Sequence, residues 1–138
     1  MKHILVTGGN GFIGSHTSIR LIESGYKVTI LDSNINSSVK CLESIKQVLI
    51  EKNHNIHDLI DFKKGDIRDK NFLINVFSNA LQSKEPIEAV IHFAGLKAVG
   101  ESVLKPLLYW ENNVFGSISL LEVMEDFECR VIVFSSSA

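Results

Sequence analysis

The most constraining feature of the sequence is a glycine-rich segment, residues 6–14, which has an apolar strand-like run before it and a helix-like apolar pattern after it. Gly9, Gly11 and Gly14 have the GxGxxG spacing, and Gly8, Gly11 and Gly14 also fit a GxxGxxG variant. Glycines in such a turn let the backbone approach a pyrophosphate closely, and the first amides of the following helix attract an anion. The segment therefore predicts a nucleotide-binding turn.

The rest of the chain alternates between apolar runs of strand length and stretches with helical periodicity. The predicted strands are Ile4–Thr7, Lys27–Leu31, Ile60–Lys64, Ala89–Ala94 and Val131–Phe134. The predicted helices are Phe12–Ser24, Ser37–Lys52, a segment capped by Asp69 in which Phe72, Val76 and Leu81 face inward, and Pro106–Asp126 with Val114, Ile118 and Leu121 on one face. In the first helix, Phe12, Ile19 and Ile22 form a stripe that can pack on a sheet. This alternation predicts the α/β class, with a doubly wound parallel sheet of about five strands.

Asp32 ends the second predicted strand and follows the glycine turn at a distance typical of dinucleotide-binding domains. A carboxylate there can accept hydrogen bonds from the hydroxyls of an adenosine ribose. Its charge would repel a 2′-phosphate, so the position favours NAD over NADP. The local sequence alone also allows a helix N-cap or a solvated turn residue.

Open α/β sheets bind ligands at the carboxyl ends of their strands, and three further segments should lie there. They are Asp66–Ile67, residues 93–97 and residues 135–137. Asp66 could bond an adenine amino group or cap a helix. Ala94 and Gly95 let a backbone approach a ligand, and Lys97 could neutralise a phosphate or be a solvated surface charge.

Composition excludes several classes of protein. A chain of 138 residues with 45% hydrophobic residues suits one packed domain, and a net charge of −2 gives no bias toward nucleic acid. We expect a soluble, cytoplasmic protein, because no apolar run is long enough to span a membrane and Cys41 and Cys129 lack disulfide or metal spacing. His54 and His57 lie near Asp58 in a polar loop, where we expect a solvated turn and no metal.

Longer blocks of sequence resemble the extended short-chain dehydrogenase/reductase family, which has a Rossmann-type NAD-binding domain. The blocks are residues 7–16, 31–37 and 65–68. Residues 91–103, 112–114 and 134–138 are similar to the UDP-hexose 4-epimerases of that family, which interconvert UDP-glucose and UDP-galactose through a 4-keto intermediate. The resemblance implies NAD as cofactor and a UDP-hexose as substrate.

The resemblance also assigns roles to individual positions. Phe12 and Ile13 would cover the pyrophosphate, Asp32 would hold the adenosine ribose, and Asp66 with Ile67 would flank adenine. The positions implied for the cofactor are Gly8, Gly11, Phe12, Ile13 and Gly14 in the turn, Asp32, Ser33, Asn34, Ile35, Asn36 and Ser37 after the second strand, Asp66 and Ile67 after the third, Phe93, Ala94, Gly95, Leu96 and Lys97 after the fourth, and Asn112 in the long helix.

Catalysis in this family needs a tyrosine base and a lysine in a Tyr-x-x-x-Lys motif, which this sequence lacks. The residues four positions after Tyr26 and Tyr109 are Ile30 and Asn113. Ser137 would hydrogen-bond the reacting sugar hydroxyl, and His92 in its apolar strand is expected to be a hydrogen-bonded core residue.

We therefore expect residues 1–138 to be an incomplete NAD-binding domain, the amino-terminal portion of an epimerase, inactive alone and without the substrate domain. The resemblance also suggests a homodimer of the full-length protein through its long helices. A non-catalytic NAD-binding module, or part of another sugar-nucleotide epimerase or dehydratase, remains an alternative. The last predicted strand should be an apolar sheet edge that favours aggregation.

Overall fold

The structure is a computed structural model that describes residues 2–9, 11–33, 39–52, 58–96 and 99–135. The described residues form a five-stranded sheet in the order β3-β2-β1-β4-β5, in which every neighbouring pair is parallel. The strands are β1 His3–Thr7, β2 Lys27–Asp32, β3 Ile60–Lys64, β4 Ile87–His92 and β5 Val131–Phe134. The predicted α/β class and doubly wound sheet are confirmed.

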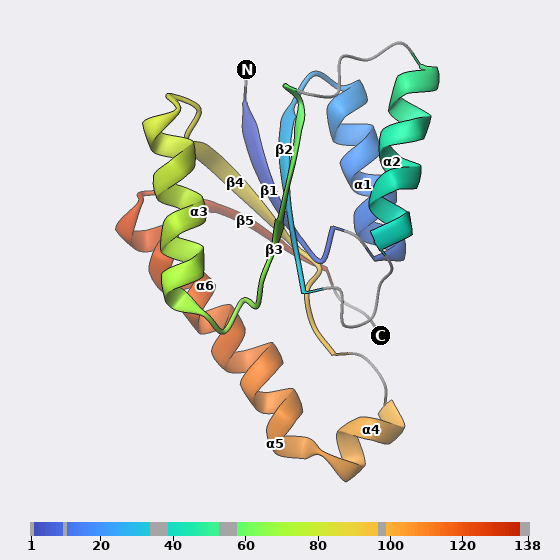
Figure 1. Cartoon of the computed structure of the whole chain (residues 1–138). Helices are drawn as coiled ribbons and strands as arrows, with labels where there is room; N and C mark the ends of the chain where they lie inside the picture. The colour runs from blue at the N-terminus through green and yellow to red at the C-terminus, as the bar shows by residue number, and fades with distance from the viewer. Residues whose placement is uncertain (1, 10, 34–38, 53–57, 97–98, 136–138) are drawn as a thin grey trace.

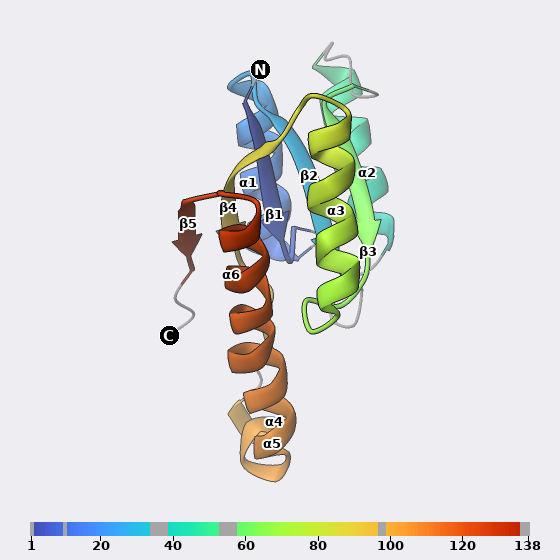
Figure 2. The ribbon, with the colours of Figure 1, turned by 90° about the vertical axis from the view of Figure 1, so that its left-hand side faces the viewer.

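Helices connect the strands and cover both faces of the sheet (Figures 1 and 2). They are α1 Phe12–Glu23, α2 Val39–Glu51, α3 Lys70–Gln82, α4 Val99–Leu104, α5 Pro106–Tyr109, the π-helix η1 Trp110–Phe115 and α6 Gly116–Asp126. Asp69 caps α3 as predicted, because its carboxylate accepts a hydrogen bond from the Phe72 amide at 3.1 Å. The chain runs from β1 outward to β2 and β3 and then crosses to β4 on the other side of β1, so the topological switch point lies at β1.

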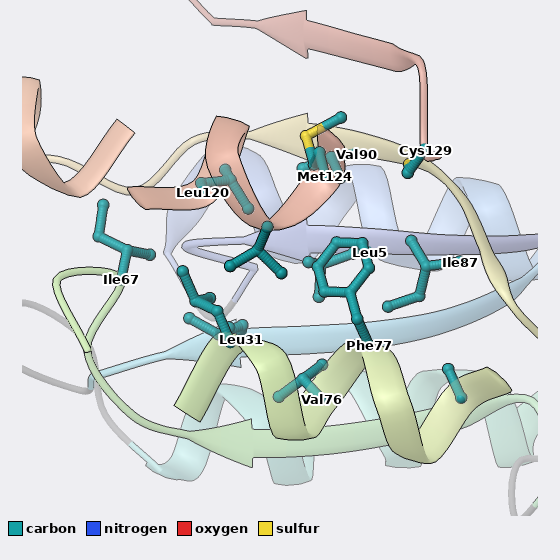
Figure 3. Packing of buried hydrophobic residues seen from close by; sticks show 13 residues of the cluster. Leu5, Leu31, Ile67, Val76, Phe77, Ile87, Val90, Leu120, Met124 and Cys129 are labelled. Atoms are coloured by element: carbon teal, nitrogen blue, oxygen red, sulfur yellow. The ribbon is translucent and has the colours of Figure 1, made fainter. Parts of the chain in front are cut away.

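Side chains that alternate along the central strands build one core on each face of the sheet. Leu5, Leu31 and Val90 belong to a cluster with residues of α3 and α6, and Figure 3 shows these side chains packed between the sheet and the two helices. Val6 and Ile30 belong to the other cluster, with residues of α1 and α2. The central strands are therefore buried on both faces, as their apolar composition predicts.

Two predicted inward positions are wrong. Phe12 is 83% exposed, because it is the first residue of α1 and the buried side of that helix is formed by Gly14, Ser18 and Ile22. Leu81 is 55% exposed. The buried stripe of α3 consists of Leu73, Val76, Phe77 and Ala80, and Leu81 lies outside it.

The long helix predicted for residues 106–126 is present, but a π-helical turn at Trp110–Phe115 separates α5 from α6. Its amino-terminal half projects away from the sheet (Figure 1). Val114, Ile118 and Leu121 share a face that is largely exposed, whereas Leu120 and Val123 on the other side pack against the sheet. The missed feature is the π-helical turn, which apolar periodicity does not reveal.

The last strand of the described sheet, β5, is largely exposed. Val131, Val133 and Phe134 are each 54% exposed. β5 pairs with β4 along one side and is at the end of the strand order. This arrangement matches the predicted apolar sheet edge.

Candidate functional site

The glycine turn lies against the ends of the two strands that flank β1. Gly8 has a φ of +67°, a conformation that favours glycine, and its amide donates a hydrogen bond to the Leu31 carbonyl at 2.7 Å. A Cβ on Gly8 would lie 2.8 Å from the Ala94 nitrogen. The turn is thus fixed to the end of β2 on one side and to the loop after β4 on the other.

Gly11 and Gly14 bring the start of α1 over this turn. The Gly11 amide donates to the Gly8 carbonyl at 3.1 Å, and a Cβ on Gly14 would lie 2.3 Å from the same carbonyl oxygen. Gly11 is the N-cap of α1 and makes no side-chain capping bond. The first amides of a helix have no carbonyl partner within it, so those of α1 are available to an anion at the turn.

The side chains of Phe12 and Ile13 stand at this helix start and are mostly solvent-exposed, at 83% and 51%. The resemblance gives them the role of covering a pyrophosphate, and exposed apolar groups beside helix amides suit that role.

Asp32 is half-buried at the carboxyl end of β2. β2 is the sheet neighbour of β1, which leads into the glycine turn. Its backbone carbonyl accepts a hydrogen bond from the Gly65 amide at 3.1 Å, which joins it to the end of β3. Ser33 follows it and is half-buried. The predicted cofactor positions Asn34, Ile35, Asn36 and Ser37 lie outside the described residues.

Asp66 and Ile67 follow β3 on the same edge, and each already has a strong local role. Arg68 donates to both carboxylate oxygens of Asp66, with Nη2 to Oδ2 at 2.6 Å and Nε to Oδ1 at 3.1 Å. This hydrogen bonding lowers the pKa of the Asp66 carboxyl and keeps it ionised. Ile67 is 4% exposed and packs into the α3 and α6 core. Their adenine contacts remain a prediction, and any adenine contact of Asp66 would be shared with Arg68.

The loop after β4 forms the other side of the site. Phe93, Ala94, Gly95 and Leu96 are half-buried, and the Phe93 amide donates to the Thr7 carbonyl at 2.9 Å. Lys97 lies outside the described residues. The structure thus brings the loop into contact with the end of β1, as the predicted position after a parallel strand requires.

Asn113 is the residue of this site that the sequence analysis does not assign. Its Oδ1 accepts from the Leu96 amide at 2.8 Å, and its Nδ2 donates to the Leu96 carbonyl at 2.9 Å. The predicted Asn112 is half-buried beside it and donates to Asn113 Oδ1 at 3.1 Å. Two consecutive asparagines in this helix are the signal in the sequence, but only the fold shows that Asn113 meets the Leu96 backbone.

The structure describes only some of the other residues considered in the sequence analysis. Ser137 lies outside the described residues, as do His54 and His57, and the described residues contain no group of three side chains suited to hold a metal. Cys129 is a buried free thiol whose pKa is raised by burial. Among the described residues, no helix is long and apolar enough to cross a membrane.

A glycine turn, an acidic residue after β2 and a loop after β4 meet at the switch point of a Rossmann-like parallel sheet, an arrangement typical of dinucleotide-binding α/β domains. Residues 5–138 match the model of the family described as GDP-mannose 4,6 dehydratase, and the chain belongs to that family. It is also homologous to UDP-glucose 4-epimerases. It is 49% identical over 138 residues to UDP-glucose 4-epimerase 1 of Oryza sativa subsp. japonica, covering 100% of this chain and 36% of that protein.

Solved structures of epimerases have the same fold. The UDP-glucose-4-epimerase of Stenotrophomonas maltophila, with bound NAD and formylated UDP-arabinopyranose, superposes with a TM-score of 0.85 at 39% identity, over 100% of this chain and 38% of that one. The UDP-glucose 4-epimerase of Bifidobacterium longum, in complex with NAD+ and UDP, gives a TM-score of 0.84 at 41% identity, over 99% and 37%. The chain thus spans less than two fifths of the length of these relatives.

Proposed function

We propose that this chain is the NAD-binding part of a UDP-hexose 4-epimerase. The observation that supports the proposal most directly is the meeting of three segments at the switch point of the sheet. Gly8 bonds to the end of β2 beside Asp32, and it also lies against Ala94 after β4. The similarity to UDP-glucose 4-epimerases, two of them solved with NAD, supports this cofactor.

The residues present fit NAD in shape and charge. The tight packing of Gly14 on the Gly8 carbonyl brings the start of α1 close to the turn, where its amides can meet a pyrophosphate. Asp32 would accept hydrogen bonds from the adenosine ribose and repel a 2′-phosphate. When bound, NAD supplies a hydride acceptor. The chain's own residues would bind and orient it between the ends of β2 and β4.

Epimerisation needs groups that this sequence does not contain. It has no Tyr-x-x-x-Lys pair, since Ile30 and Asn113 stand four residues after its two tyrosines. We propose that the chain binds NAD but does not turn over UDP-galactose by itself. The alternative is a non-catalytic NAD-binding module that is not part of an epimerase. For the epimerase, we propose a UDP-hexose as substrate, and its turnover requires the Tyr-x-x-x-Lys pair.

We propose further that the exposed apolar face of the long helix packs against a second copy. Along this helix, Leu107, Trp110, Ile118 and Leu121 are 78%, 60%, 44% and 41% exposed. Exposed apolar surface, where it is contiguous, is typical of interaction sites. Sedimentation of the chain and its Leu107→Glu variant tests the proposal, because a monomer in both cases contradicts it.

The cofactor proposal is tested by titrating the 138-residue chain with NAD and NADP in a calorimeter. We expect NAD to bind more tightly than NADP, and Asp32→Asn to weaken NAD binding by at least about tenfold, because charge-assisted hydrogen bonds contribute roughly 1.5–3 kcal/mol. Asp61→Asn is the matched control, since Asp61 is an exposed carboxylate on β3. A chain that binds neither cofactor, or prefers NADP, contradicts the proposal. Measurable epimerisation of UDP-galactose by the chain alone would refute the proposal that the chain is inactive by itself.

A further inference from the structure

A continuous set of hydrogen bonds through His92 joins the end of β1, the loop after β4 and the π-helical turn. His92 is 5% exposed, and its Nδ1 lies 2.5 Å from Thr7 Oγ1. Its Nε2 lies 3.1 Å from Ser117 Oγ. Thr7 Oγ1 accepts from the Ala94 amide at 3.2 Å, and Ser117 Oγ donates to the Asn113 carbonyl at 2.6 Å.

The Ser117 end of the network fixes the direction of these bonds for a neutral imidazole. A backbone carbonyl only accepts, so the single proton of the Ser117 hydroxyl is given to Asn113, and Ser117 Oγ must accept from His92 Nε2–H. In a neutral imidazole the other nitrogen, Nδ1, is then an acceptor, and the Thr7 hydroxyl donates to it. Each hydroxyl in this network therefore donates one bond and accepts another.

The network ends on the backbone that forms one wall of the cofactor site. Thr7 holds the Ala94 amide, and a Cβ on Gly8 would lie 2.8 Å from that same nitrogen. At the other end, Asn113 holds both polar groups of the Leu96 backbone, while its own carbonyl is bonded to Ser117. Residues 94–96 are thus held from two sides by groups that meet at one buried imidazole.

We propose that His92, with Thr7 and Ser117, is a positioning residue that sets the loop at residues 94–96 against the glycine turn for cofactor binding. The inference rests on the proposed NAD-binding function. Asp32 and Asp66 lie at the ends of β2 and β3, whereas this loop lies at the end of β4. A dinucleotide bound across the switch point has its adenosine half on the β2 side, so the loop contacts the other half.

Because the loop is expected to contact the half of NAD that ADP lacks, comparing the two ligands gives a binding test that a general loss of structure would not mimic. Calorimetric titration of the 138-residue chain compares NAD with ADP, which carries only the adenosine half and its phosphates. We expect Ser117→Ala and Thr7→Val to bind NAD about fivefold more weakly, the size expected for one lost hydrogen bond, and to bind ADP within about twofold of the original chain. Ser117→Thr and Thr7→Ser keep the hydroxyls and should restore NAD affinity. Ser119→Ala, on the same helix outside the network, is the control.

Amide hydrogen exchange tests the network whether or not the chain binds NAD. In Ser117→Ala, the direct hydrogen bond from the Leu96 amide to Asn113 is kept. We nevertheless expect this amide to exchange about fivefold faster, because the carbonyl of Asn113 has lost its bond from the Ser117 hydroxyl. Exchange at residues 94–96 that is unchanged in both Ser117→Ala and Thr7→Val overturns the proposal. Equal weakening of NAD and ADP also overturns it. Failure of the unchanged chain to bind either ligand, with exchange responding as expected, overturns only the NAD-binding function.

Discussion

Substitution of Gly14 by alanine tests whether tight packing between α1 and the glycine turn fixes the site. A Cβ at this position would lie 2.3 Å from the Gly8 carbonyl oxygen and 2.7 Å from Gly9 Cα, whereas ordinary contacts begin near 3.4 Å. Both obstructing atoms belong to the backbone, so no side-chain rotation can relieve the overlap. The turn and the helix must separate by about 1 Å.

The expected cost follows from two opposing effects. Overpacking of a well-packed interior costs about 1–3 kcal/mol, and backbone obstruction places Gly14→Ala in the upper part of that range. Replacing glycine by alanine in a helix returns about 0.5–1 kcal/mol. We therefore expect a net loss of about 2 kcal/mol in the free energy of unfolding. With a urea slope of about 2 kcal/mol per molar, the unfolding midpoint should fall by about 1 M.

Urea unfolding followed by circular dichroism measures this change, and NAD titration of the same variant measures its effect on the site. Gly100→Ala is the matched control, because Gly100 lies in α4 and a Cβ there meets no atom within 4 Å. That variant should be unchanged or slightly more stable. If Gly14→Ala unfolds at the midpoint of the unchanged chain and binds NAD equally well, the inferred close packing of helix and turn is wrong.

Two further predictions concern stability and association. His3 is buried, with Nδ1 2.6 Å from the Glu85 carbonyl oxygen and Nε2 2.7 Å from Thr29 Oγ1. Burial lowers the pKa of His3, and the charge of Lys27 lowers it further. The hydrogen bond to Glu85 and the charges of Glu85 and Asp61 oppose this shift. Because the unfolded chain then binds a proton more readily than the folded one, His3 should contribute stability above pH 6.5 that is lost as the pH falls below it. Urea unfolding at pH 7.5 and pH 5.5 should show a smaller loss in His3→Gln, and equal losses would refute this. Val133→Lys adds a charge to the exposed edge strand, where Val133 is 54% exposed, and should reduce self-association in light scattering while changing the free energy of unfolding by less than about 0.5 kcal/mol. Unaltered scattering would argue against β5 as the associating edge.

Local sequence signals predict most of the elements and the positions of Gly8 and Asp32 at the ends of β1 and β2. The strand at Ile60–Lys64 has its predicted bounds, and Asp69 caps α3 as predicted. These features depend on periodicity and on hydrogen bonds within a few residues, which a single sequence displays. Gly8 and Asp32 were recognised for the same reason, since the turn and the acidic residue belong to one strand-helix-strand unit.

The features that the sequence did not reveal depend on contacts between distant segments. Leu81 has a helical spacing compatible with burial, but the sheet covers a neighbouring stripe of α3, and only packing selects between them. Asn113 meets Leu96 because a π-helical turn and the loop after β4 come together in space. No local pattern specifies such a meeting.

The sequence by itself determined the parallel α/β architecture, the glycine turn and the acidic residue after β2, because the physical requirements for these features are local. The tertiary structure decided which segments complete the site. It placed Ala94 against Gly8, and it joined Thr7, His92 and Ser117, which come from β1, β4 and α6, into one hydrogen-bond network. Each of these contacts requires two segments to be brought together by the sheet, so none exists until the whole domain has folded.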